Sequence, residues 1–190
     1  MGKRAASVVR NCLLLGTVIF FLPATGCNRG GNEPVAPLSI QLTSPGVTAG
    51  AVSKASTCDG QGSSPQLSWS APPAGTESLA LVVTDRDSPF GYNFVHWVLY
   101  NIPANTRELP GGLPAQGQLA DGTEQGLNDN DKLGYTPPCP HGKSAHRYDF
   151  VLYAVDMKVN LPSASKKQLL HAISSHVLAK GELIARYGRE

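Results

Sequence analysis

The stretch VVTDRDSPFGYNFVHWVLYNIP (residues 82–103) decides the fold class. Both of its ends are rich in β-branched and aromatic side chains, and a short polar segment with Pro and Gly separates them. Together with the apolar run just before it, this pattern predicts two strands, over residues 78–84 and 94–102, joined by a turn.

Further strands are expected on both sides of this pair. The segments PLSIQLTSP (residues 37–45), residues 66–69 and RYDFVLYAVD (residues 147–156) each have strand character. Between them, residues 104–134 contain many Gly, Asp and Asn and show little periodicity, which indicates irregular loops.

A helix is predicted near the end of the chain, in SASKKQLLHAISSHVLAKGELIARYG (residues 163–188). Ser163 or Ser165 can cap it, and Gly181 interrupts or ends it. Its apolar side chains at helical spacing are Leu169, Leu170, Ile173 and Val177. Strands in the body and a helix at the end predict a mainly β protein, an antiparallel, Greek-key-like β-sandwich with a C-terminal helix and irregular loops.

Length, charge and motif spacing indicate how many domains the chain has and which partners are not expected. The 190 residues suit one domain of ordinary size. The net charge of +2 depends on Lys3, Arg4 and Arg10, and the acids slightly outnumber the bases in the rest of the chain. Nucleic acid is therefore not an expected partner. No Cys-x-x-Cys or His-Glu-x-x-His spacing occurs, so neither a metal nor another cofactor is expected.

The N-terminus has the pattern of an export signal. A basic segment is followed by the apolar run CLLLGTVIFFLPA (residues 12–24) and by small residues before Cys27. The end of this run resembles the bacterial lipobox, so residues 1–27 are predicted as a signal peptide with Cys27 as the lipidation site. Ordinary cleavage near residue 24 or 26 is the alternative. Residues 28–37 then form a linker and residues 38–190 the domain, in the cell envelope, outside the cytoplasm and anchored to a membrane by lipid.

The cysteines leave one candidate disulfide. Cys12 belongs to the leader and Cys27 to the lipidation site, which leaves Cys58 and Cys139. Two leftover cysteines outside the cytoplasm are more often paired than free. The sequence does not show whether their Cα atoms come close enough, so the pairing stays open.

Polar residues stand where the two central strands end. Asp85 and Asp87 follow the first strand, and His96 lies just inside the second. An Asp before Ser-Pro commonly forms a turn, and a lone His in an aromatic strand is commonly a core residue. Both the structural and the functional interpretation of these residues stay open on the pattern alone.

Three segments in order resemble the phosphatidylethanolamine-binding protein family, in its bacterial, Raf kinase inhibitor-like branch. They are TCDGQGSSPQLSWSAPPAGTESLALVVTD (residues 57–85), DRDSPFGYNFVHWVLYNIP (residues 85–103) and YTPPCPHGKSAHRYDFVLYAVD (residues 135–156). The ending HVLAKGELIARYGRE (residues 176–190) also resembles the family's terminal helix, and the resemblance covers nearly everything after residue 38. The sequence departs from the family pattern at Arg86, Thr136, Pro137 and His141.

The resemblance implies a β-sandwich with a small pocket at one end for phosphate or phospholipid head groups. Carried over, the pocket residues are Asp85, Asp87, His96, Pro138, Cys139, Pro140, His146 and Tyr148. In this interpretation His96, His146 and Tyr148 supply donors, and Asp85 accepts a proton from His96 and so fixes its tautomer. Asp87 has a simpler alternative, capping backbone N–H groups.

We therefore expect a binding protein, anchored to the membrane by its N-terminal lipid. No nucleophile accompanies the acids and histidines, so an enzyme is not expected. Other branches of the family act as inhibitors, which leaves as the alternative a protease or kinase inhibitor that acts through a surface loop. A homodimer stays open.

Overall fold

The computed structural model describes residues 38–142 and 144–189, and long antiparallel strands dominate these ranges. The strands expected at 78–84, 94–102 and 147–156 are confirmed as β6, β7 and β10. The elements, in chain order, are β1 (Leu38–Ser39), β2 (Leu42–Thr43), β3 (Val47–Thr48), β4 (Ala51–Val52), a 3-10 turn (Lys54–Ser56), β5 (Leu67–Trp69), β6 (Ser78–Asp85), β7 (Phe94–Pro103), β8 (Glu108–Leu109), β9 (Glu124–Gln125), β10 (His146–Val155), α1 (Lys166–Ala172) and β11 (Val177–Tyr187).

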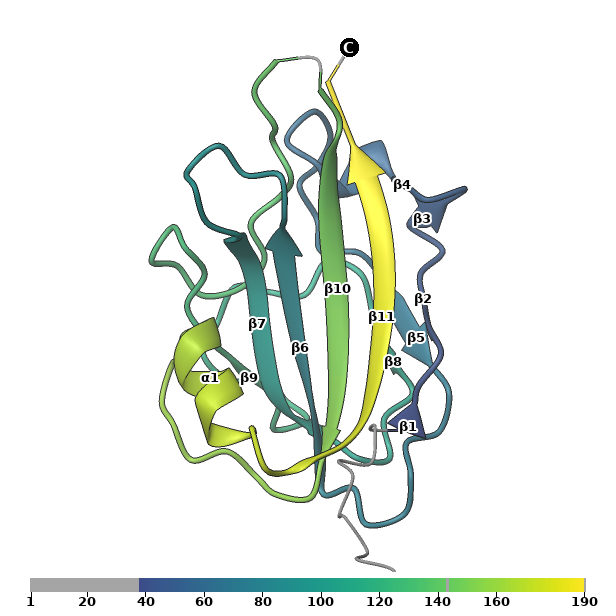
Figure 1. Ribbon diagram of the computed structural model, residues 1–190, viewed down its shortest axis with the longest axis vertical. Helices are drawn as coiled ribbons and strands as arrows, with labels where there is room; N and C mark the ends of the chain where they lie inside the picture. Colours follow the sequence, from purple (N-terminus) through teal and green to yellow (C-terminus); the bar gives the residue numbers. More distant parts are fainter. Residues whose placement is uncertain (1–37, 143, 190) are drawn as a thin grey trace, which may run out of the picture. The chain divides into compact units, whose positions relative to one another are not determined.

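The described strands form a large and a small sheet. The large one has the order β3-β4-β11-β10-β6-β7-β9, with β1 also on β11, and the small one has the order β2-β5-β8. The four long strands β7, β6, β10 and β11 lie side by side and antiparallel (Figure 1). Because β1 and β4 pair with β11 in parallel, the large sheet is mixed, which corrects the purely antiparallel expectation.

Each face of the large sheet is packed against another layer. The inner face carries residues such as Trp97 and Phe150 in a core shared with Leu67 and Trp69 of the small sheet. The outer face carries a second core, in which Val98 packs with Leu169 of α1. Figure 1 shows α1 beside β7. The protein is therefore mainly β and sandwich-like, with a single layer of helix on its outer side.

The predicted C-terminal helix is wrong over most of its length. The helix α1 begins after Ser165, whose side chain accepts a hydrogen bond from the backbone N–H of Gln168 in a capping box, and it ends at Ala172. The residues that follow form β11, the longest described strand.

The sequence of β11 contains a strand pattern that the spacing of its larger apolar residues obscured. Small residues such as Ala179, Gly181 and Ala185 are buried and alternate with the more exposed Lys180 and Glu182. Gly181 is required by close packing, because a Cβ there would lie 2.6 Å from the carbonyl oxygen of Ile40. Pairing along all of β10 then favours the extended form over a helix.

The predicted signal peptide (residues 1–27, with Cys27) and linker (residues 28–37) lie outside the described residues. Within the described ranges, no helix has the length and apolar character needed to cross a membrane.

Candidate functional site

The ends of β6 and β10 bring three polar side chains together. Tyr148 pairs with Asp85 across the two strands. His146 lies two residues before Tyr148 and so shares its face of the sheet. All three are buried, with exposed fractions of 0% for Tyr148, 6% for Asp85 and 8% for His146.

A β-bulge adds His96 to this group. In the pairing of β6 with β7, Val83 lies opposite Trp97 whereas Thr84 lies opposite Val95, which leaves His96 as the extra residue. Bulges commonly turn a side chain toward a functional site. His96 therefore faces the same side as its neighbour Trp97, although strict alternation would place it on the outer face.

These residues line a cavity of about 200 Å³ at the end of the sheet. Its walls come from the β6–β7 loop, the start of β7 and the loop before β10, which meet at one end of the molecule (Figure 1). The lining residues are Asp85, Ser88, Pro89, Phe90, Phe94, His96, Asn130, Thr136, Pro137, Cys139, Pro140, His141, His146 and Tyr148.

Asp85 orients His146, and not His96 as the sequence suggested. Its Oδ2 lies 2.7 Å from Nδ1 of His146, and its Oδ1 accepts a hydrogen bond of 2.9 Å from the backbone N–H of Asp87. The correction follows from position, since Asp85 lies directly across from the strand that carries His146. The ring nitrogen of His146 that stays free is Nε2.

His96 is held by a backbone carbonyl. Its Nδ1 lies 2.7 Å from the carbonyl oxygen of Thr136, and since a carbonyl can only accept, Nδ1 carries the proton. Burial lowers the pKa of His96 below its ordinary value of 6.5, against the opposing influence of the Thr136 carbonyl and the nearby carboxylates. The neutral ring therefore leaves Nε2 as an unprotonated acceptor.

Tyr148 carries a buried donor with no hydrogen-bond partner among the described residues, its hydroxyl group. Burial raises the pKa of Tyr148, and the neighbouring Asp85 carboxylate raises it further, so the hydroxyl keeps its proton. A buried polar group without a partner costs free energy, and such groups are rare. The hydroxyl of Tyr148 is thus available to a bound molecule.

The cavity contains most of the residues proposed from the sequence. Six of them line it: Asp85, His96, Cys139, Pro140, His146 and Tyr148. Asp87 and Pro138 do not. Asp87 is exposed and caps the backbone N–H of Arg147 at 2.8 Å, and the carbonyl of Pro138 accepts a hydrogen bond from the N–H of Cys58.

The sequence analysis did not identify the apolar residues that line the cavity, or the loop that contributes Asn130 to it. Phe90 and Phe94 were visible as aromatic residues within the turn, but no periodic pattern linked them to the acids. Asn130 comes from the segment predicted only as irregular loops, and the sequence contains no signal that it reaches the cavity.

A disulfide fixes one wall of the cavity. Cys58 and Cys139, the pair left open by the sequence, are bonded in the structure, with Cα atoms 5.3 Å apart. The N–H of Cys58 also donates to the carbonyl of Pro138 at 3.0 Å. The segment around Cys139 is therefore tied to a part of the chain 81 residues away.

An ion-pair network on the outer face holds the other wall. Arg86, one of the positions at which the sequence departs from the family pattern, forms an ion pair with the buried Asp149, and its backbone N–H donates to the carbonyl of Arg147 at 2.9 Å. Arg147 also lies on this face, with its Nε 3.9 Å from Asp149. These contacts anchor the start of the β6–β7 loop.

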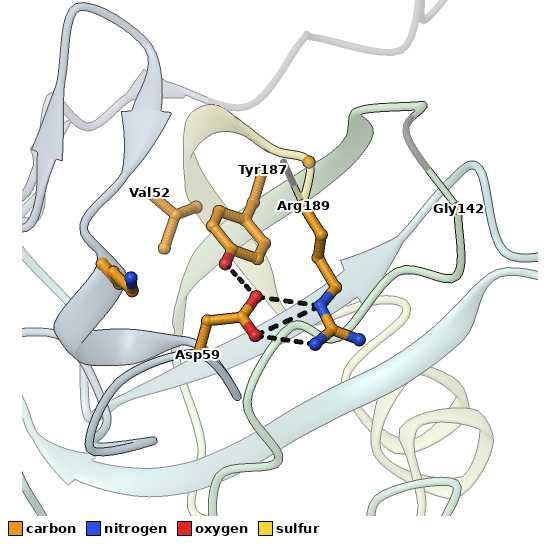
Figure 2. A pocket seen from close by; sticks show the side chains of 7 residues that line it. Val52, Asp59, Gly142, Tyr187 and Arg189 are labelled. Atoms are coloured by element: carbon orange, nitrogen blue, oxygen red, sulfur yellow. Dashed lines mark hydrogen bonds and ion pairs between the residues drawn. The ribbon is translucent and has the colours of Figure 1, made fainter.

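A second, larger cavity of about 650 Å³ lies near the C-terminus (Figure 2). At its centre, the Asp59 carboxylate accepts hydrogen bonds from the Tyr187 hydroxyl at 2.6 Å and from the Arg189 guanidinium at 2.8 to 3.2 Å. Hydrogen bonds from Tyr187 and then Arg189 lower the pKa of Asp59. All of these groups have partners within the cluster.

Metal-binding groups are not found in the described ranges. No cluster of three or more His, Cys, Asp or Glu side chains occurs there. His171 lies in α1, whereas His176 lies beyond it and pairs with Asp156 at 2.7 Å. These two histidines do not share a site.

Comparison with known proteins assigns the family. The family model described as phosphatidylethanolamine-binding protein matches residues 43–188. The chain belongs to this family. A UPF0098 protein of Methanothermobacter thermautotrophicus is 46% identical over 134 residues, which cover 70% of this chain and 87% of that protein. A UPF0098 protein of Pyrococcus horikoshii is 36% identical over 182 residues, which cover 94% of this chain and 88% of that protein.

Solved structures of the family have the same fold. A phosphatidylethanolamine-binding protein homologue from Chlamydia trachomatis matches with a TM-score of 0.72 at 35% identity, over 80% of this chain and 99% of that one. E. coli YbcL, described as a member of the mammalian family, matches with a TM-score of 0.72 at 30% identity and the same coverage. The family membership expected from the three sequence segments is confirmed.

Proposed function

We propose that this member of the phosphatidylethanolamine-binding protein family is a binding protein of the cell envelope, lipid-anchored outside the cytoplasm. In this proposal the cavity at the ends of β6 and β10 takes up a phosphate-type anion or the phosphate of a phospholipid head group. The observation that carries the proposal is the hydroxyl of Tyr148, which is buried among the lining residues of the cavity and has no hydrogen-bond partner within residues 38–142 and 144–189.

Two groups around the cavity suit an anion of this kind. The Tyr148 hydroxyl donates, and Nε2 of His146 donates when that ring is protonated beside Asp85. In that arrangement the Asp85 carboxylate balances the charge of the ring, and the site has little net charge. We therefore expect modest affinity, with selection by hydrogen bonding.

A proton must accompany the anion. Nε2 of neutral His96 is an acceptor, so a phosphate oxygen can approach it only if the ring or the ligand carries a proton there. A monoester that keeps one P–OH group, or a protonated His96, meets this requirement. Binding of a phosphomonoester is therefore expected to strengthen as the pH falls through its second pKa, at about 6.

Binding rather than catalysis is the proposed role because a nucleophile is not organised at the site. Ser88 lines the cavity, but its hydroxyl accepts only a long contact of 3.4 Å from the N–H of Phe90, and no imidazole bonds to it among the described residues. The described structure also contains nothing that favours the inhibitor alternative.

The test is titration with inorganic phosphate and with phosphoethanolamine, followed through the histidine ring signals in NMR spectra. We expect saturable shifts at His96 and His146. Tyr148→Phe removes only the free hydroxyl, and it should weaken phosphate binding about tenfold, the loss of one hydrogen bond to a charged group.

Tyr187→Phe is the matched control for this variant. The same atom is removed from a tyrosine one strand away whose hydroxyl already bonds to Asp59. It should leave phosphate affinity unchanged. Absence of any shift at millimolar phosphate, or equal losses in both variants, would exclude the proposed pocket.

A further inference from the structure

The two ends of the disulfide differ in their exposure to solvent. Cys139 is exposed and lines the smaller cavity, whereas Cys58 is half-buried just after the 3-10 turn. Disulfides that only hold a structure together commonly resist reduction, and exposed ones are commonly the labile or regulatory ones. A reductant in solution therefore reaches this bond from the Cys139 side.

The cavity wall that contains Cys139, residues 136–140, has few other tethers. Three of its five residues are proline, which has no backbone N–H to donate. Within the described ranges, the backbone of this wall forms hydrogen bonds only through Thr136, to His96, and through Pro138, to Cys58. The covalent link to Cys58 therefore contributes much of what holds the wall in place.

The same wall positions His96. Nδ1 of His96 donates to the carbonyl of Thr136 at 2.7 Å, and the N–H of Thr136 donates to the carbonyl of His96 at 2.8 Å. The Thr136 carbonyl fixes the tautomer of this ring. Because Cys139 lies close to Thr136 in the chain, loss of the cross-link loosens the carbonyl on which the orientation of His96 depends.

We propose that the Cys58–Cys139 disulfide is a thiol–disulfide exchange site for a dithiol reductant, and that its reduction weakens anion binding in the cavity. The exchange itself stands on the exposure of Cys139. Only the effect on binding rests on the proposed function, since it concerns regulation of the same site.

The reaction has two balanced steps. A thiolate of the reductant attacks Sγ of Cys139 and forms a mixed disulfide, while the bond to Cys58 breaks and the Cys58 sulfur leaves as a thiolate that takes up a proton. The second thiol of the reductant loses its proton and attacks the mixed disulfide. The reductant becomes a disulfide, and Cys139 leaves as a thiolate and takes up a proton. Two electrons and two protons thus pass from the dithiol to the protein.

We expect the reduced domain to stay folded. Both faces of the large sheet keep their buried apolar cores, which do not include either cysteine. The stability that one cross-link of this kind contributes is also smaller than the usual stability of a domain of this size. Reduction is therefore a local change at the cavity wall.

The first measurement treats the full chain with dithiothreitol in native buffer and maps the cysteines by alkylation and mass spectrometry. We expect Cys58 and Cys139 to be alkylated without any denaturant. With glutathione, a monothiol, followed by N-ethylmaleimide, we expect glutathione on Cys139 and maleimide on Cys58. Reaction only after unfolding, or glutathione on Cys58, would overturn the proposed exchange site.

The second measurement follows the histidine ring signals by NMR, and the affinity for inorganic phosphate, before and after reduction. We expect the His96 signals to shift. Phosphate affinity should fall roughly tenfold, the result if only one molecule in about ten keeps the wall in its bonded position. The signals of His176, which pairs with Asp156 at the opposite end of β11, should not move.

The double variant Cys58→Ala/Cys139→Ala is the matched control for the reductant. It should bind phosphate as weakly as the reduced wild type and should not respond to dithiothreitol. A response of this variant as large as that of the wild type would overturn the inference, because the reductant would then act elsewhere on the chain.

The two measurements also separate this inference from the proposed function. Complete reduction with unchanged His96 signals and unchanged phosphate affinity would refute the effect on binding and leave the anion pocket standing. Shifted His96 signals without phosphate binding in either form would refute the proposed function and leave the exchange site standing.

Discussion

Two carboxylates at the same end of the sheet differ in their exposure to solvent and in the donors that bond to them. Asp85 is 6% exposed and accepts from the N–H of Asp87 and from His146. The Asp59 side chain is 25% exposed and accepts from Tyr187 and Arg189. The two clusters are neighbours, since His146 and Tyr187 pair across β10 and β11.

The two clusters differ in whether the tyrosine hydroxyl near the carboxylate has a hydrogen-bond partner. Beside Asp85, the hydroxyl of Tyr148 has no partner in the described structure. Beside Asp59, the corresponding hydroxyl of Tyr187 is already bonded (Figure 2). The cavity at Asp59 is nevertheless the larger, at about 650 Å³ against about 200 Å³. Of these two tyrosine hydroxyls, the one that has no partner in the described structure therefore lies at the smaller cavity, which is the candidate ligand site.

The strongest test of the comparison removes the covalent link between the two regions. Cys58 precedes Asp59, and Cys139 lines the smaller cavity. The double variant Cys58→Ala/Cys139→Ala frees the unfolded chain from a cross-link over 81 residues. We expect the free energy of unfolding to fall by about 3–4 kcal/mol in denaturant titrations.

The wild-type protein in excess dithiol reductant is the control for this variant. Its unfolding curve should coincide with that of the double variant. A loss below about 1 kcal/mol would show that packing alone holds the wall around Cys139.

The second test compares the two carboxylates by the same substitution. Asp85→Asn leaves one oxygen for two donors, so either the N–H of Asp87 or Nδ1 of His146 loses its acceptor while buried. We expect the free energy of unfolding to fall by about 2 kcal/mol. Asp59→Asn should have a smaller effect, because water replaces the lost acceptor.

Chemical denaturation of both asparagine variants at pH 7 makes this measurement. Equal losses would mean that burial does not distinguish the two clusters.

The smallest expected effect is on the pH dependence of the free energy of unfolding. His96 and Asp59 should each change it in a different pH range. Burial lowers the pKa of His96, so the unfolded chain binds more protons and stability declines as the pH falls below 6.5. The pKa of Asp59 is also lowered, but from 3.8, so its contribution is present above that pH and is lost only in stronger acid.

Unfolding curves measured from pH 3 to pH 8 test both pH ranges. The buffers must be free of phosphate, because bound phosphate would stabilise the folded state. His96→Asn should flatten the profile near pH 6, and Asp59→Asn should flatten it only below about pH 4. If His96→Asn changed the profile only below about pH 4, or Asp59→Asn changed it near pH 6, these assignments would be contradicted.

The sequence predicted the central strands well because their signal is local. The segments that became β6, β7 and β10 combine alternation with β-branched and aromatic residues. The C-terminal segment failed because its strand identity depends on distant partners. Ala179, Gly181 and Ala185 are small because other chain segments pack closely against them, and Gly181 lies against Ile40.

The site was predictable in its residues but not in its pairings. Asp85, His96, His146 and Tyr148 followed from the family resemblance, and all four line the cavity. Which histidine bonds to Asp85 depends on strand register and on the bulge at His96, and neither can be read from spacing. The contribution of Asn130 depends on the path of an irregular loop.

The place of β11 in the sheet has a consequence for how the protein is made. The last described strand of the chain pairs with β10 at the centre and with β1 and β4 near the beginning. A growing chain that stops before Val177 exposes one edge of β10 and leaves the early strands without their partner. The large sheet is therefore completed only after β11 has been synthesised, and a nascent chain that lacks β11 keeps this edge of β10 unpaired.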